Sequence, residues 1–82
     1  MKLANAIKKM EKAGATVTSY TDRRNDHTTY YAKFENATIE FHADEENDVD
    51  YFSRTYAYDH GSQENLRFFY DTAKAAIRSA IQ

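Results

Sequence analysis

The chain has 82 residues, of which 41% are hydrophobic and 15% aromatic, and its formal net charge at pH 7 is −2. This length accommodates one domain, the aromatic content argues against intrinsic disorder, and the slight negative charge provides no general basic field for nucleic-acid binding. Because the chain has no cysteine and no apolar run of about 18 residues, we expect neither a disulfide-stabilised secreted domain nor a membrane span. The expectation is a single domain over residues 1–82 that works in a reducing cytoplasm.

The first segment has the apolar spacing of an amphipathic helix. Leu3, Ile7 and Met10 fall on one stripe of a helix predicted over residues 2–13. Gly14 follows, at the position where a residue of left-handed conformation ends many helices.

Four strands are predicted in the middle of the chain. β-branched and aromatic residues, many of them alternating with polar ones, indicate strands over residues 15–21, 28–35, 37–43 and 49–58. The polar run 22–27 predicts a turn, and Asn36 suits a tight hairpin. In residues 49–58 both alternating sets contain aromatics, so the pattern leaves the buried face of this strand open.

A second helix is predicted over residues 63–81. Ser62 suits its N-cap, and Leu66, Phe69, Ala73 and Ile77 share one apolar stripe.

These elements predict an α+β fold of the two-layer sandwich type. A helix, a three- or four-stranded antiparallel meander and a second helix follow one another, and both helices pack on one sheet face. The predicted core consists of Leu3, Ile7, Met10, Val17, Phe34, Ile39, Phe41, Leu66, Phe69, Ala73 and Ile77.

The residue types of catalysis are present without the spacing that catalysis needs. Asp59 and His60, with Ser53 or Ser62, contain the groups of a hydrolase triad, but no Gly-x-Ser-x-Gly turn surrounds either serine. The acidic loop that begins at Asp44 has acidic residues at alternate positions, Asp44, Glu46, Asp48 and Asp50, as a calcium loop does. However, Val49 stands at the position of the glycine of a calcium loop, and Thr55 at the position of its last glutamate. We expect no catalytic residue, cofactor or metal centre, with a divalent-ion site in this loop as the alternative to a solvated loop.

Two surface features remain as candidates for partner binding. The first is the sheet face turned away from the helices, where we expect Thr16, Thr18, Tyr20, Tyr31, Lys33, Thr38, Glu40, His42, Arg54 and Tyr56. Tyrosine and arginine are enriched at protein interfaces, so Tyr20, Tyr31, Arg54 and Tyr56 are the candidate contacts, although tyrosine also simply suits strands.

The second feature is an acidic stretch over residues 44–50. It contains five carboxylates, those of Asp44, Glu45, Glu46, Asp48 and Asp50. Such a run is typical of a solvated loop, and it also suits docking on a basic partner such as the nucleic-acid-binding surface of a host complex.

The order of elements resembles that of the double-stranded RNA-binding domain, which also runs from helix through strands to helix. That family has a lysine cluster at the start of its second helix, where this chain has Ser62-Gln63-Glu64-Asn65. An acidic residue at that place disfavours direct binding of phosphates.

The chain also resembles small proteins encoded by phages and other mobile elements. Its opening Met-Lys-Leu-Ala-Asn-Ala-Ile-Lys-Lys-Met-Glu-Lys-Ala-Gly-Ala-Thr-Val and its closing Tyr-Asp-Thr-Ala-Lys-Ala-Ala-Ile are similar to theirs. Some of these proteins are anti-CRISPR inhibitors, which bind host defence complexes stoichiometrically. The resemblance implies an accessory protein of the host cytoplasm that acts by occupying a partner's surface.

Three hypotheses follow from the sequence. The leading one is a non-catalytic protein-binding module that inhibits a host complex such as a CRISPR effector. The second is direct nucleic-acid binding through Lys8, Lys9, Lys12, Arg23 and Arg24. The third is self-association through an edge strand or the open sheet face.

Overall fold

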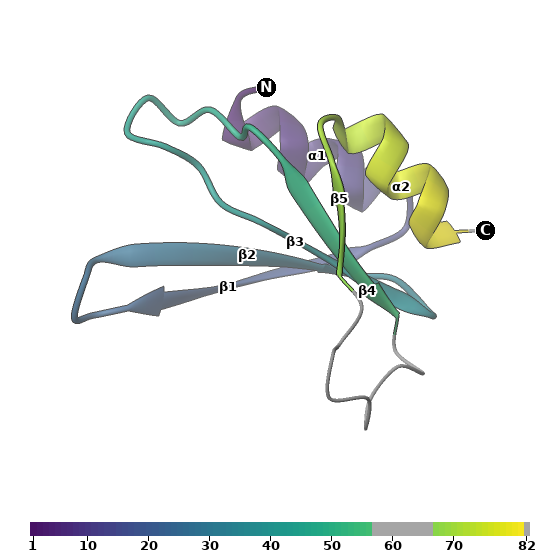
Figure 1. The fold of residues 1–82 in the computed structure, drawn as a ribbon, viewed down its shortest axis with the longest axis horizontal. Coiled ribbons are helices and arrows are strands. Elements are labelled where there is room, and N and C mark those ends of the chain that lie inside the picture. Colours follow the sequence, from purple (N-terminus) through teal and green to yellow (C-terminus); the bar gives the residue numbers. More distant parts are fainter. Residues whose placement is uncertain (57–66, 82) are drawn as a thin grey trace.

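The structure is a computed structural model that describes residues 1–56 and 67–81. These residues form two helices and one antiparallel sheet of five strands in the order β1-β2-β3-β4-β5 (Figure 1). The elements are α1 (Leu3–Lys12), β1 (Thr16–Asp22), β2 (His27–Lys33), β3 (Ala37–Phe41), β4 (Phe52–Tyr56), β5 (Phe68–Tyr70) and α2 (Ala73–Ile81). Both helices lie on one side of the sheet, which confirms the predicted two-layer α+β architecture with one strand more than expected.

The helix α1 ends in a cap that depends on glycine. Gly14 has a φ of +106°, and its N–H donates to the carbonyl of Glu11 at 3.0 Å. The N–H of Ala15 donates to the carbonyl of Met10, also at 3.0 Å. This pair of bonds satisfies carbonyls of the last turn and directs the chain into β1. The predicted helix over residues 2–13 is confirmed to within one residue at each end.

Tight turns join the first three strands. β1 pairs with β2 from Thr16 opposite Lys33 to Asp22 opposite His27. In the turn between them, the Asp22 carboxylate accepts the N–H of Arg24 at 3.0 Å. The next turn is closed by the N–H of Phe34, which donates to the carbonyl of Ala37 at 2.8 Å. The hairpin predicted around Asn36 is therefore confirmed.

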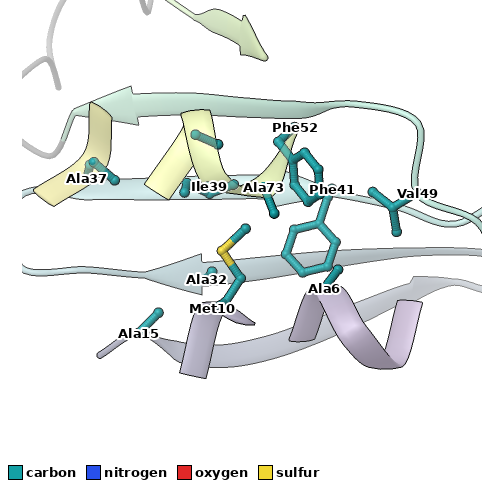
Figure 2. Close-up of a cluster of buried hydrophobic side chains, with 12 residues drawn as sticks. Ala6, Met10, Ala15, Ala32, Ala37, Ile39, Phe41, Val49, Phe52 and Ala73 are labelled. Atoms are coloured by element: carbon teal, nitrogen blue, oxygen red, sulfur yellow. The ribbon is translucent and has the colours of Figure 1, made fainter. Parts of the chain in front are cut away.

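The core lies between the helices and one face of the sheet (Figure 2). Ala6 of α1 and Ala76 of α2 are completely buried, and such small side chains allow the helices to approach the strands closely. The larger rings of Phe41 and Phe52 fill the space between the layers, with their centroids 5.5 Å apart. Shape-matched packing of this kind excludes water and supplies most of the stability of a small domain.

Most of the predicted core is confirmed. Met10, Ile39, Phe41 and Ala73 are buried, and Leu3, Ile7, Val17, Phe34 and Ile77 are half-buried against them. Leu66 lies outside the described residues. Phe69 is 63% exposed, so its assignment to the core was wrong. Phe52, in the strand whose buried face the sequence left open, is buried in the core.

The second helix begins later than predicted. Residues 68–70 are β5, which pairs with β4 from Phe52 opposite Tyr70 to Arg54 opposite Phe68. The helix α2 starts only at Ala73, and the hydroxyl of Thr72 accepts the N–H of Ala75 at 3.1 Å. The expected helix over 63–81 is therefore wrong for residues 67–72. Its first residues and the Ser62 cap lie outside the described residues.

Candidate functional site

The sheet face opposite the helices carries side chains from all five strands. The strand register aligns Thr18, Tyr31, Glu40, Ser53 and Phe69 in one line across the sheet. Each of them neighbours a residue that packs into the core, so its own side chain lies on the other face. No helix among the described residues covers this face, which we call the open face (Figure 1).

Four aromatic rings contact one another in sequence across the open face. His27 contacts His42 at a centroid distance of 4.9 Å, His42 contacts Tyr51 at 5.4 Å, and Tyr51 contacts Phe69 at 5.9 Å. We call these four residues the aromatic row. It begins at the start of β2, passes the end of β3 and the start of β4, which the acidic stretch connects, and ends in β5.

The aromatic row is both exposed and held in place. Tyr51 is 41% exposed and Phe69 is 63% exposed. The first two contacts are edge-to-face, an arrangement that is worth about 0.5–1.5 kcal/mol for a pair of rings. Mutual contact restricts the rotamers of the rings before any partner arrives, which lowers the entropy cost of binding.

Sequence reasoning found only part of this row. His42 was expected on the outward-facing side, whereas His27 fell in the predicted turn and Phe69 in the predicted helix. Tyr51 belongs to the strand whose two faces the sequence left undecided. The signal that joins the four rings is the pairing of β2, β3, β4 and β5, which alternation within one strand does not contain.

The described residues place one ion pair on the open face beside the aromatic row. The guanidinium of Arg67 donates to the Glu40 carboxylate at 3.0 Å. Both side chains are partly exposed, so we expect this pair to contribute no more than about 1 kcal/mol. Lys33 adds an exposed cation at the end of β2. Among the described residues, the open face therefore presents ring surface with little net charge of its own, and the acidic stretch and the turn with Arg23 and Arg24 border it.

The tyrosines predicted for this face divide between the two sides of the sheet. Tyr20 is 65% exposed and Tyr31 is half-buried, and both have the open-face register. The placement of Arg54 and Tyr56 on the open face was wrong. β4 pairs with β3 so that Arg54 lies opposite buried Ile39, which turns it toward the helices.

Arg54 is a structural residue of the helix side. It is only 5% exposed, and its Nη1 donates to the hydroxyl of Tyr56 at 2.7 Å. Its guanidinium lies 3.8 Å from the ring centroid of Tyr56 and 4.6 Å from that of Phe68. Cation–π contacts of this kind favour a desolvated guanidinium by up to about 2 kcal/mol each. The contact with Phe68 ties β4 to the short strand β5.

The acidic stretch contains carboxylates with two different roles. Asp44 accepts the N–H groups of Glu46 and Asp48, both at 2.9 Å, and Asp48 lies 3.5 Å from the ammonium of Lys2. The hydrogen bond from Asp48 is the main reason why the pKa of Asp44 lies below its ordinary value. Among the described residues, the exposed carboxylates of Glu45, Glu46 and Asp50 have no ion-pair partner.

The same stretch brings three carboxylates together. Ligand oxygens of Asp44, Glu46 and Asp48 lie within 4.8 Å of one another. The ammonium of Lys2 contacts this group, since it donates to the carbonyl of Glu46 at 3.0 Å. A lysine at this place supplies the positive charge that an ion would otherwise provide, so we assign no metal to the cluster.

Comparison with known proteins assigns no role to these residues. No protein-family model, curated protein or solved structure matches it. Neither helix of the described residues is long and apolar enough to cross a bilayer.

Proposed function

We propose that this chain is a non-catalytic protein-binding module that docks its open face on a partner protein. The observation that carries the proposal is the aromatic row, in which four rings contact one another and those of His27, Tyr51 and Phe69 are exposed. Monomeric proteins rarely leave contiguous aromatic surface uncovered without a use for it. Aromatic residues that are rigid before binding are also the typical anchors of protein interfaces.

The charge of the open face favours a protein over a nucleic acid. Aromatic rings also stack on bases, but sites for single strands combine them with a cationic groove along the phosphates. Here Arg67 is neutralised by Glu40, and Lys33 stands at the end of its strand. Arg23 and Arg24 lie in the β1–β2 turn, next to the His27 end of the aromatic row, where Arg24 is 3.7 Å from the Asp22 carboxylate. They form a local basic spot at one end of the row rather than a cationic track along it.

The acidic stretch adds a preference within this proposal. Asp50 precedes Tyr51 directly, so unpaired carboxylates border the aromatic row. A partner with a basic rim around an apolar patch would therefore be steered to this surface and held in one orientation. In the specific form implied by the resemblance to small phage proteins, the partner is a host defence complex and the module inhibits it stoichiometrically.

Two neighbouring phenylalanines provide a matched test. The immobilised chain captures its partner from host lysate, and the affinity of the purified partner is then measured for two variants. Phe69→Ala removes a ring of the aromatic row and should weaken binding about tenfold or more. Phe68→Ala removes a ring from the helix side of the same strand and should change the affinity less than about twofold, with circular dichroism confirming that both variants fold.

Equal loss of affinity in the two variants would show that β5 acts through stability and not as a contact. Loss only in Phe68→Ala would move the interface to the helix side. If the chain instead binds a second copy of itself, which light scattering would show as an oligomer, the open face or the edge strand β1 serves self-association.

A further inference from the structure

A basic groove runs between the two helices, away from the open face. Lys9 and Lys12 of α1 line it on one side, and Lys74 and Arg78 of α2 on the other. Its apolar surface includes Ile77 and Ile81, and its volume is about 380 Å³. Figure 1 shows the two helices side by side on the same layer. The groove is independent of the aromatic row, which lies on the opposite side of the sheet.

The four cations of the groove are not neutralised by the protein. No acidic residue lines the groove, and none of the four forms an ion pair within the described residues. Lys9 and Lys12 are three residues apart and Lys74 and Arg78 four apart, spacings at which like charges repel on a helix. Lys74 is also the second residue of α2, where the helix dipole disfavours a cation.

The apolar part of the groove narrows the choice of ligand. Ile81 is 60% exposed, and Ile77 beside it is half-buried. Nucleic acids gain from aromatic platforms on which bases stack, and none of the described residues that line this groove is aromatic. An amphipathic helix with carboxylates on both flanks of an apolar stripe matches both the cations and the isoleucines.

We propose that the groove between α1 and α2 binds an acidic amphipathic helix of a partner protein. The apolar stripe of that helix rests on Ile77 and Ile81, and its flanking carboxylates pair with the lysines and the arginine. Since α2 has nine residues, or about 2.5 turns, a ligand helix of about two to three turns covers the length of the groove. The module then has two binding surfaces, one on each side of the sheet.

The probe for this proposal is a fluorescent peptide of about 14 residues, with leucines at helical spacing and glutamates at the flanking positions. Fluorescence polarisation should show saturable binding at low salt that weakens as salt rises. The double variant Lys74→Glu, Arg78→Glu should weaken binding about tenfold or more. The matched control Lys8→Glu, Lys33→Glu makes the same charge change outside the groove and should alter affinity less than about twofold.

Ile81→Ser tests the apolar contact separately and should weaken binding about threefold to tenfold. Absence of saturable binding by the unmodified chain at low salt would overturn the proposal. So would equal binding of a peptide with the same composition in scrambled order, because charge alone would then account for it. Displacement of the peptide by a single-stranded oligonucleotide would assign the cations to nucleic acid.

The peptide test of the groove can be distinguished from the test of partner binding at the open face. Phe69→Ala should leave peptide affinity unchanged within about twofold, since its ring lies on the other side of the sheet. Loss of peptide binding in this variant would place the acidic helix on the aromatic row and overturn the groove proposal.

Discussion

Two phenylalanines on opposite faces of neighbouring strands differ in what their removal should cost. Phe52 is 1% exposed and contacts the ring of Phe41, whereas Phe69 is 63% exposed. Phe52→Ala should reduce the free energy of unfolding by about 3–5 kcal/mol, because it removes a buried ring and leaves a cavity. Phe69 buries about a third of its surface, so Phe69→Ala should cost about 0.5–1 kcal/mol of the 1.5–3 kcal/mol that full burial provides.

Urea denaturation followed by circular dichroism measures both values. An 82-residue domain is expected to have a total stability of about 4–12 kcal/mol, so Phe52→Ala is at risk of unfolding. The milder pair Phe52→Leu and Phe69→Leu keeps the comparison measurable, with the larger loss again expected at position 52. A larger loss at position 69 would refute the placement of residues 68–70 in a strand and favour a buried helical position for Phe69.

Three further changes test the local structure. Gly14→Ala should lower the free energy of unfolding, measured by urea denaturation, by about 1–2 kcal/mol. The whole loss comes from the φ of +106°, since the added methyl would meet no atom within 4 Å. An unchanged stability would contradict the left-handed cap. Ala76→Leu should cost about 1–3 kcal/mol, since Ala76 is completely buried between α2 and the sheet, and a neutral result would indicate a loose helix–sheet contact. Ionised Asp44 stabilises the fold at pH values above its unfolded pKa of about 3.9, and this stabilisation is lost as the pH falls through the lowered pKa of the folded state. At pH values below about 4, the thermal midpoint of the unmodified chain should therefore decrease more steeply with falling pH than that of Asp44→Asn. Parallel pH profiles of the two proteins would exclude this role.

Local patterns predicted the elements whose burial follows directly from spacing. The stripe of Leu3, Ile7 and Met10 identified α1, and the alternation around Ile39 and Phe41 identified the buried face of β3. Gly14 and Asn36 marked the turns because few residues suit such positions. In each case one short segment contained the whole signal.

The patterns failed where pairing with a distant strand decides the outcome. Leu66, Phe69 and Ala73 have helical spacing, yet residues 68–70 pair with β4 because aromatic residues also suit a strand and an edge was open to them. The face of Arg54 is set by its register with Ile39, and both alternating sets in β4 were compatible with burial. The aromatic row depends on this same register, so it was visible only as separate residues.

The central claim is that a partner protein docks on the aromatic row, and chemical-shift mapping tests it most directly. The ¹⁵N-labelled chain is titrated with the captured partner, and the amide shifts of every assigned residue are followed. The account predicts that the largest perturbations cluster at His27, His42, Tyr51 and Phe69, with the core residue Ala76 unchanged. Perturbations confined to the helices, with these four positions unaffected, would contradict it.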